Sequence, residues 1–248
     1  MAKKIVCLDA GHGGKDSGAI NGKRHEADDV LKLVKKVGIY LKKYVTVKYT
    51  RTKDIYESPS QKAAEGNAFK ADLFVSIHRD CFSSDTAKGY STLVKTDTGM
   101  RKTFADYVNA KMEKKIGFRN RGTKLRDDLA VLNQTKMPAV LCEVGFISNE
   151  DDNDIFDKKF TMIAKIIANG ILKALDLGTP ISYGESIVAG DKVKIKTCAV
   201  YSGAAKGKKV SDYALRQTHT VKKLSLTKKD ALLKEINSWV PVQYLYKA

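Results

Sequence analysis

Three short runs of apolar residues stand out along the chain, and each leads to side chains that can carry chemistry. The runs are Lys4–Leu8, Ala71–Asp80 and Ala139–Cys142. They are rich in β-forming residues and too short for core helices, which favours buried strands of an α/β sheet. Sites in open α/β sheets collect at the carboxyl ends of strands. The sequence places His12, His78 and Glu143 at such ends, so we expect them to lie close together.

Between these strands, apolar residues recur every three or four positions, as they do on one face of an amphipathic helix. The pattern predicts helices at residues 26–43, 60–69, 102–115 and 160–175. Further strands are expected at 45–51, 89–94 and 130–132, and a basic loop at 119–124. Strands that alternate with amphipathic helices indicate an α/β fold, with a twisted, mainly parallel or mixed sheet flanked by helices.

The pattern changes after residue 176. Residues 177–186 combine Gly, Pro and Ser without periodicity, which is typical of a linker. Short β-rich segments follow at 191–195, 219–224 and 238–245, with one helical turn expected at 231–236. We therefore expect a first domain at 1–176 and a small all-β, SH3-like domain at 187–248. Trp239, the single tryptophan, is assigned to the core of that domain in preference to a binding surface.

Composition narrows the class of protein. With 248 residues, 43% hydrophobic and 29% charged, the chain has the make-up of a soluble globular protein. No apolar run is long enough to span a membrane. A core strand is expected by Ile5, which leaves no room for a secretory signal. The sequence therefore predicts a protein made in the cytosol without a Sec signal of its own.

The net charge of +17 favours a polyanionic partner. Residues 181–248 alone hold 13 Lys or Arg and 5 Asp or Glu. Nucleic acid and an anionic bacterial wall both fit this excess. Because the basic residues are scattered and do not form one arm, a solvated basic surface is also open.

Four cysteines, at positions 7, 81, 142 and 198, show no CxxC spacing. Two of them fall in expected core strands, which favours buried free thiols in a reducing compartment over disulfides. Cys81 and Cys142 lie next to the expected site, and the interpretation of either as a metal ligand is the less favoured one.

A glycine-rich turn follows the first strand and lets the backbone approach a metal or an anion closely. Its spacing matches neither a dinucleotide-binding fingerprint nor a P-loop, so we discount a phosphate cradle. Glu26 opens a predicted helix, where it either complements the helix dipole or binds a metal near His12. His25 is expected to be a surface residue.

Two histidines with carboxylates are the ingredients of a catalytic zinc site, which has three protein ligands and one position for water. The ion lowers the pKa of that water to roughly 7 and polarises a carbonyl. His12, Glu26 and His78 fit the ligand set. Glu143 fits the base that takes the proton of the water and passes it to a leaving amine.

In their order and context, these residues resemble the zinc-dependent N-acetylmuramoyl-L-alanine amidases, whose motifs read D-x-G-H-G-G, a single Glu, S-I-H-x-N and E-x-G-F-x-S-N. The matching positions are Asp9–Gly14, Glu26, Ser76–Asp80 and Glu143–Asn149. The resemblance covers about residues 3–175. It implies zinc held by His12, Glu26 and His78, with Glu143 as the catalytic acid/base. It also implies cleavage of the bond between N-acetylmuramic acid and L-alanine in peptidoglycan.

Two positions depart from the family pattern. Asp80 stands where the family usually has Asn, and Asp29 stands where an Asn often follows the Glu ligand. Neither change removes a ligand, but Asp80 adds negative charge near the metal and is a candidate to alter the contacts with substrate. Arg121 and Lys124 are candidates to bind the acidic stem peptide, although a solvated basic loop fits them equally well.

The C-terminal segment is similar to the SH3-like wall-binding modules of lytic enzymes, through 190–195 and 232–242. With the amidase motifs and no signal, the chain resembles a bacteriophage endolysin, which waits in the cytosol until a phage-encoded pore releases it. A host autolysin or sporulation amidase, another zinc peptidase, and a non-catalytic wall- or nucleic-acid-binding protein are the alternatives. The expected partners are peptidoglycan and anionic wall polymers, with nucleic acid disfavoured, and no oligomeric state is indicated.

Overall fold

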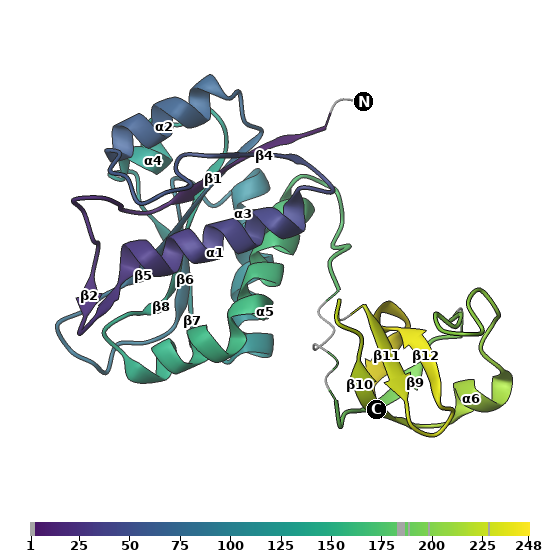
Figure 1. Cartoon of the computed structure of the whole chain (residues 1–248). Coiled ribbons are helices and arrows are strands. Elements are labelled where there is room, and N and C mark those ends of the chain that lie inside the picture. The colour runs from purple at the N-terminus through teal and green to yellow at the C-terminus, as the bar shows by residue number, and fades with distance from the viewer. Residues whose placement is uncertain (1–2, 183–186, 188, 198, 228) are drawn as a thin grey trace. The chain divides into compact units, whose positions relative to one another are not determined.

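The computed structural model describes residues 3–248 except 183–186, 188, 198 and 228. The chain forms two compact units, Met1–Ser182 and Tyr183–Ala248 (Figure 1). Among the described helices, none is both long and apolar enough to cross a membrane.

The first unit alternates strands with helices, as the hydrophobic pattern predicts. Its strands are β1 (Ile5–Ala10), β2 (Ile20–Asn21), β3 (Arg24–His25), β4 (Thr46–Tyr49), β5 (Leu73–Asp80), β6 (Tyr90–Val94), β7 (Asn120–Leu125) and β8 (Ala139–Phe146). Its helices are α1 (Glu26–Leu41), α2 (Pro59–Ala68), α3 (Gly99–Lys111), the π-helical turn η1 (Met112–Ile116), α4 (Ala130–Asn133) and α5 (Glu150–Ala174).

A six-stranded sheet in the order β4-β1-β5-β8-β6-β7 forms the centre of this unit. β4, β1, β5 and β8 are parallel to one another, β6 is antiparallel to β8, and β7 is parallel to β6. Helices α1 and α3 both pack on α5, while α2 contacts α4 (Figure 1). The predicted mainly parallel, mixed sheet with flanking helices is confirmed. The adjacent carboxyl ends of β1 and β5 bring His12 and His78 together.

Helix α5 begins ten residues earlier than the helix predicted at 160–175. Its start is capped by Asn149, whose side-chain oxygen accepts a hydrogen bond from the Asp152 backbone N–H at 3.0 Å. The first turn is acidic, which suits a helix N-terminus. The prediction relied on the run of isoleucines in the second half and therefore missed the polar first half, which buries Phe156.

Two further predictions for this unit are wrong. Residues 119–124, expected as a basic loop, include most of strand β7, which pairs with β6 at the edge of the sheet. An edge strand leaves its side chains half-exposed, so it carries no apolar run. Residues 130–132, expected as a strand, form helix α4 instead. A three-residue apolar run does not distinguish a strand from one turn of helix.

The second unit is a small antiparallel β structure, consistent with the predicted all-β segment. Its elements are β9 (Lys192–Ile195), α6 (Asp212–Arg216), β10 (His219–Leu224), β11 (Asp230–Leu233), β12 (Ser238–Pro241), the 3-10 turn η2 (Val242–Tyr244) and β13 (Leu245–Lys247). The strand order is β12-β11-β10-β9-β13, and each pairing is antiparallel. Alternate apolar side chains of these strands meet in one core cluster.

Three predictions in this unit need correction. Of the helical turn expected at 231–236, residues 231–233 belong instead to strand β11, which pairs with both β10 and β12. Residues 234–236 form the turn that follows it. The strand expected at 238–245 is divided by η2, which begins after Pro241. Trp239, assigned to the core, is only half-buried and lies outside the core cluster.

The cysteines that the structure describes are free: Cys7 and Cys142 are buried, and Cys81 is exposed. Cys198 lies outside the described residues. Within the segment expected as a linker, Ile181 is buried and is held by Asn169 of α5. Its backbone N–H and C=O both bond to that side chain, at 3.0 and 2.8 Å.

Candidate active site

Strand β1 leads into the turn that carries His12, whose backbone is left-handed with φ of 57°. Buried Arg51 holds this turn in place. Its Nη2 donates to the carbonyls of Gly11 at 2.7 Å and Ala27 at 2.9 Å. Because Ala27 belongs to α1, Arg51 ties the His12 turn to the helix that begins with Glu26.

Two glycines make room for the side chains of the site. A Cβ on Gly11 would lie 2.3 Å from Cε1 of His78. A Cβ on Gly18 would lie 2.7 Å from Cδ2 of His12 and 2.7 Å from Oε2 of Glu26. Both contacts are closer than real Cβ atoms allow, so a side chain at either position would displace the cluster. The glycine-rich turn therefore serves close packing against the imidazoles.

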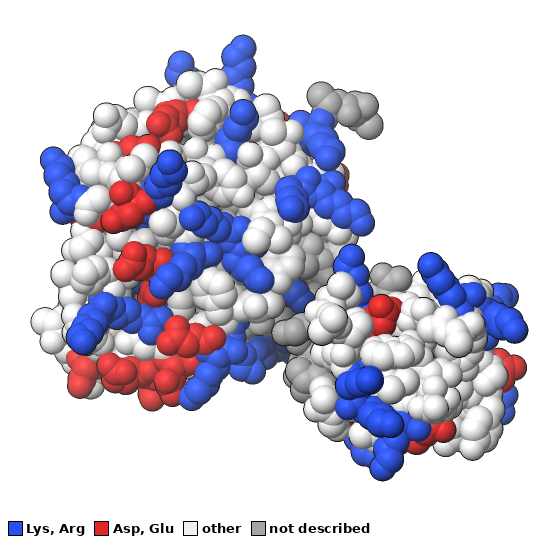
Figure 2. Space-filling view, viewed as in Figure 1, with Lys and Arg blue, Asp and Glu red and all other residues white. Residues whose placement is uncertain are grey.

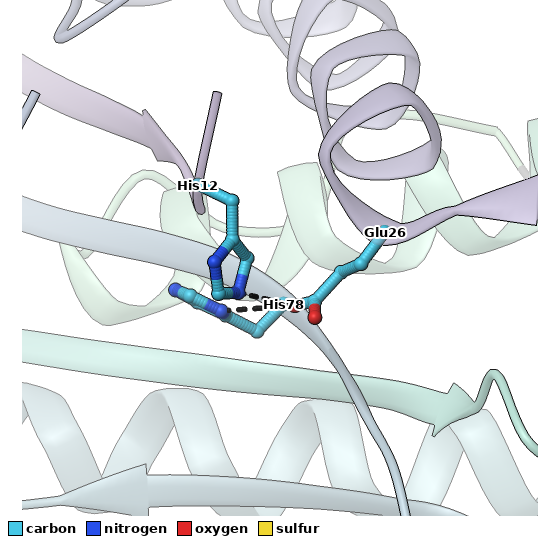
Figure 3. A group of neighbouring side chains, drawn as sticks. All are labelled: His12, Glu26 and His78. Atoms are coloured by element: carbon cyan, nitrogen blue, oxygen red, sulfur yellow. Dashed lines mark hydrogen bonds and ion pairs between the residues drawn. The ribbon is translucent and has the colours of Figure 1, made fainter. Parts of the chain in front are cut away.

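His12, Glu26 and His78 converge from three elements: the turn after β1, the start of α1, and β5 (Figure 3). Oε1 of Glu26 lies 3.1 Å from Nε2 of His12 and 3.0 Å from Nδ1 of His78. One nitrogen or oxygen from each side chain lies within 4.8 Å of the others. Among the described residues, no other group of His, Cys, Asp or Glu has this metal-binding geometry, and it includes no cysteine.

The negative charge of Glu26 and the two imidazoles of His12 and His78 stabilise one another. Burial alone raises the pKa of Glu26, but hydrogen bonds and ion pairing with the two histidines hold that pKa well below its usual range. Burial lowers the pKa of His12, yet its bonds to Glu26 and Asp16 raise it to about 9. The pKa of His78 is also raised, because Glu26 outweighs the effect of burial. A carboxylate held ionised between two imidazoles is a donor set prepared for a cation.

Asp16 contributes to this set, and the sequence analysis missed it. Its Oδ2 lies 2.9 Å from Nδ1 of His12, so Nδ1–H donates to Asp16 and leaves Nε2 as the ligand atom. Carboxylate partners of this kind orient metal-ligating histidines in many metalloproteins. His12, His78 and Asp16 also border a cavity of about 370 Å³. These features fit a catalytic zinc, which needs three protein ligands and an open position.

Glu143 lies on β8, directly across from His78 on β5. Its Oε2 is buried and has no hydrogen-bond partner among the described residues. Burial raises the pKa of this carboxyl group to about 7, helped by Asp80 and Glu26, while His78 and Lys124 oppose the rise. A carboxyl group that titrates near neutral pH is suited to take up and release a proton.

A buried polar group behind the site was also missed. The carboxylate of Asp9 accepts hydrogen bonds from Thr50 at 2.7 Å, Lys62 at 2.9 Å and Ser76 at 2.6 Å. The Lys62 ammonium also donates to the carbonyls of Ala10 and His12. These bonds fix the turn that carries His12. Lys62 lies in a helix of ordinary composition, so no local signal in the sequence distinguishes it from a surface lysine.

Comparison with known proteins places this site in a family. Residues 6–173 match the family model described as N-acetylmuramoyl-L-alanine amidase. The chain belongs to that amidase family. It is 43% identical over 184 residues to the endolysin of Bacillus phage SPP1, a match that covers 70% of this chain and 67% of the phage protein. It is 36% identical over 178 residues to the probable cell wall amidase LytH of Staphylococcus aureus, covering 70% of this chain but 58% of LytH.

Solved amidase structures share the fold. The catalytic domain of CwlV, an amidase from Bacillus (Paenibacillus) polymyxa, is 33% identical with a TM-score of 0.65, over 70% of this chain and 99% of that chain. An N-acetylmuramoyl-L-alanine amidase from Clostridium difficile is 30% identical with a TM-score of 0.66, over 71% of this chain and 98% of that chain.

The two residues that depart from the family motifs, Asp29 and Asp80, both make specific polar contacts in the structure. Asp29, in place of the usual Asn, is buried and pairs with two arginines: its Oδ2 lies 2.7 Å from Arg79 and 2.6 Å from Arg24. The Arg79 guanidinium also stacks on Phe156, 4.4 Å from the ring centre. Asp80 caps the end of β5, where its Oδ1 accepts the backbone N–H of the next residue at 2.9 Å.

The two basic candidates lie on β7. The Arg121 guanidinium stacks on Phe146 of β8, 4.9 Å from the ring centre, and its Nε is buried without a partner among the described residues. Lys124 acts on the pKa of Glu143 through its charge, and so does Asp80 with the opposite sign. The structure therefore brings Lys124 and Asp80 into electrostatic range of Glu143.

Proposed function

We propose that this chain is a zinc-dependent peptidoglycan hydrolase that cleaves the amide bond between N-acetylmuramic acid and the L-alanine of the stem peptide. The observation that carries the proposal is the convergence of His12, Glu26 and His78 beside Glu143 in a member of the amidase family. The endolysin and cell wall amidase among its relatives support the same substrate.

His12 through Nε2, Glu26 through Oε1 and His78 through Nδ1 would hold the zinc ion. When bound, zinc supplies a Lewis acid that polarises the amide carbonyl and brings the pKa of a water to roughly 7. Asp16 keeps the His12 imidazole in the tautomer that binds the ion. Arg51 and Lys62 keep the His12 turn in register with α1 through hydrogen bonds of the protein itself.

Glu143 would move the proton. In its ionised form it accepts a proton from the attacking water as the new C–O bond forms at the carbonyl carbon. It then donates that proton to the nitrogen of L-alanine as the C–N bond breaks. The products are the amine of L-alanine and the lactyl carboxylic acid, whose remaining proton passes to the amine to give an ammonium and a carboxylate. A pKa of about 7 suits both steps, because the group must accept and release a proton in one cycle.

Lys124 and Arg121 would bind the acidic stem peptide on the β7 side of the site, and Asp80 would modulate those contacts. The second unit would be an SH3-like wall-binding domain joined to the catalytic domain through residues 177–186. Lys and Arg side chains are dispersed over the visible faces of both units (Figure 2). This dispersion suits general attraction to peptidoglycan and anionic wall polymers better than a nucleic-acid groove.

We assign the chain the role of a bacteriophage endolysin, which acts on the wall after release through a phage-encoded pore. The support is the 43% identity to the phage SPP1 endolysin. A host autolysin is the second candidate, favoured by the similarity to LytH.

Digestion of purified peptidoglycan, with and without a zinc chelator, tests the reaction. Mass spectrometry should find stem peptides with a free L-alanine amino terminus and glycan strands without peptide, and the chelator should abolish both. Products cut within the stem peptide would instead indicate a peptidase and would contradict the proposed bond.

A further inference from the structure

The second unit contains a surface pocket whose lining side chains are not needed for the core of the unit. The pocket has a volume of about 220 Å³ and is lined by Ser202, Gly203, Ser225, Asp230 and Trp239. Its size is that of one sugar ring or one amino-acid residue, below the range of typical small-molecule sites. Trp239 is half-buried here and contributes nothing to the core cluster, so its ring is available to this pocket.

Hydrogen bonds fix both walls of the pocket. On one side, the backbone N–H of Ser202 donates to the carbonyl of Trp239 at 2.9 Å. Gly203 packs so tightly that an added Cβ would lie 3.0 Å from Cδ1 of the indole. On the other side, the Ser225 N–H donates to the Asp230 carbonyl at 2.9 Å, and the Asp230 N–H donates to the Ser225 hydroxyl at 3.2 Å. The pocket is therefore preformed, which lowers the entropy cost of binding.

Two polar side chains of the pocket lack partners. The Ser202 hydroxyl oxygen is buried and has no hydrogen-bond partner among the described residues. The Asp230 carboxylate takes part in none of the ion pairs or side-chain hydrogen bonds found among those residues. Buried polar groups in native proteins are almost always paired, so the Ser202 hydroxyl needs a partner from outside the described protein atoms, either a water or a polar group of a ligand.

The charged groups around the pocket restrict the charge that its ligand can carry. Among the described residues that line the pocket, Asp230 is the only charged one. Asp230 would repel a phosphate or carboxylate. The ammonium of Lys223 already lies 5.8 Å from the centre of the Trp239 ring, so it would repel a second ammonium there. The remaining class is a neutral ligand with hydroxyl or amide groups and one flat apolar face.

We infer that this pocket binds a neutral N-acetylated amino sugar of the glycan strand. The C–H face of the sugar ring stacks on the Trp239 indole. Its hydroxyl and amide groups bond to the Asp230 carboxylate and the Ser202 hydroxyl. This inference rests on the wall-binding role proposed for the second unit but not on the amidase reaction. The dispersed basic residues attract the wall as a whole, and the pocket recognises the uncharged glycan.

Titration of the full-length protein with chitotetraose, a soluble chain of N-acetylglucosamine, tests the inference by calorimetry or NMR. Wild type should bind it, with little dependence on salt because the ligand is neutral. Trp239→Ala should weaken binding roughly tenfold or more, as loss of a central aromatic contact does. Ser202→Ala and Asp230→Asn, which disturb the fold less, should each weaken it several-fold. Tyr213→Ala is the matched control, since this side chain is 73% exposed and lies outside the pocket.

The inference is overturned if wild type fails to bind chitotetraose at millimolar concentration, or if all three pocket variants bind it like wild type. It is also overturned if a stem peptide, and not the sugar, competes for the pocket. Release of peptide from soluble muropeptides should be the same in Trp239→Ala and wild type. Sugar binding without any amidase product would contradict the proposed reaction alone, so the two failures are distinguishable.

Discussion

Arg79 and Asp29 form a buried ion pair, with 2.7 Å between Nη1 and Oδ2, that joins β5 to α1 beside the cluster of His12, Glu26 and His78. The backbone N–H of Arg79 also donates to Oε1 of Glu26 at 2.9 Å. The residue after His78 therefore holds both the Glu26 carboxylate and the helix from which it projects. An Asn at position 29 would satisfy hydrogen bonds but would leave a buried guanidinium with less counter-charge.

Replacing Asp29 by Ala should strongly destabilise the fold, because it leaves buried Arg79 without its carboxylate. Removal of one partner of a buried ion pair costs roughly 3–5 kcal/mol. The free energy of unfolding, measured by urea denaturation, checks this. Asp157→Ala is the control: it removes the exposed partner of Arg24 and should cost less than about 1 kcal/mol. Equal, small effects of the two variants would contradict a structural role for the pair.

Replacing His78 by Ala removes one of the three proposed ligands. Zinc content measured by atomic absorption should fall well below one ion per chain, and wall lysis should vanish. His25→Ala, which changes an exposed histidine at the start of α1, should keep both zinc and activity. If the His78 variant kept a full zinc ion, the assignment of ligands would be wrong.

The proximity of the two histidines was predictable because each of them comes at the end of a short apolar strand. The carboxyl ends of parallel strands meet at one sheet edge, so His12 and His78 were expected near each other once Lys4–Leu8 and Ala71–Asp80 were predicted as strands of one sheet. That the two strands are direct neighbours is known only from the structure. The role of Glu26 remained open between helix dipole and ligand. The structure brings its carboxylate between the two imidazoles, which the sequence position alone does not determine.

The supporting residues were not predictable, because their partners are distant in the chain. Lys62 and Asp9 are 53 residues apart, and Arg79 and Asp29 are 50 residues apart. A lysine or an arginine within a helix or a strand carries no local sign of such a partner. Strand β7 was missed for a different reason. An edge strand buries neither face fully, so its sequence is polar and resembles that of a loop.

Replacing Glu143 by Gln keeps the size and the hydrogen-bonding capacity of the side chain but removes the proton acceptor. Loss of general acid–base catalysis should lower kcat roughly 100- to 10,000-fold. Zinc should stay bound, since Glu143 lies outside the proposed ligand set. Wild-type turnover would mean that another group is the base, and loss of zinc would make Glu143 a ligand.

The affinity for zinc should rise with pH up to about 9. In the metal-free protein, Glu26 and Asp16 raise the pKa of His12 to about 9 despite burial, so a proton occupies the site at neutral pH. That proton must leave before zinc binds, which makes the apparent affinity fall at least about tenfold for each pH unit below this pKa, and more where His78, whose pKa is also raised, is protonated as well. Competition with a chelating dye at several pH values measures the slope.

A variant of Asp16 serves as the control for this pH dependence. Asp16→Asn should lower the pKa of His12 and flatten the dependence at neutral pH. In metal-free protein, the stability contributed by protonated His12 is fully present below its usual pKa and is lost as pH rises through about 9. Zinc affinity that stays constant between neutral pH and 9 would contradict the raised pKa.

The last prediction concerns the division of labour between the two units. A chain that ends at Ser182 should keep its catalytic fold, because Ile181 packs onto Asn169 of α5 and every proposed site residue lies earlier. It should release stem peptides from soluble muropeptides at the rate of the full chain. Tethering to the wall raises the effective concentration of the catalytic unit without changing its chemistry. The shortened chain should therefore sediment poorly with purified walls and lyse them slowly.

Residues 183–248 alone should sediment with the walls. Part of that binding should weaken as salt rises, since residues 181–248 carry 13 Lys or Arg against 5 Asp or Glu. A salt-resistant remainder that disappears in Trp239→Ala would separate specific recognition from general charge attraction. If the chain ending at Ser182 bound walls as tightly as the full chain, and residues 183–248 did not bind at all, the second unit could not be a targeting domain. Its basic excess would then be a solvated surface, and its role would lie in assembly or stability.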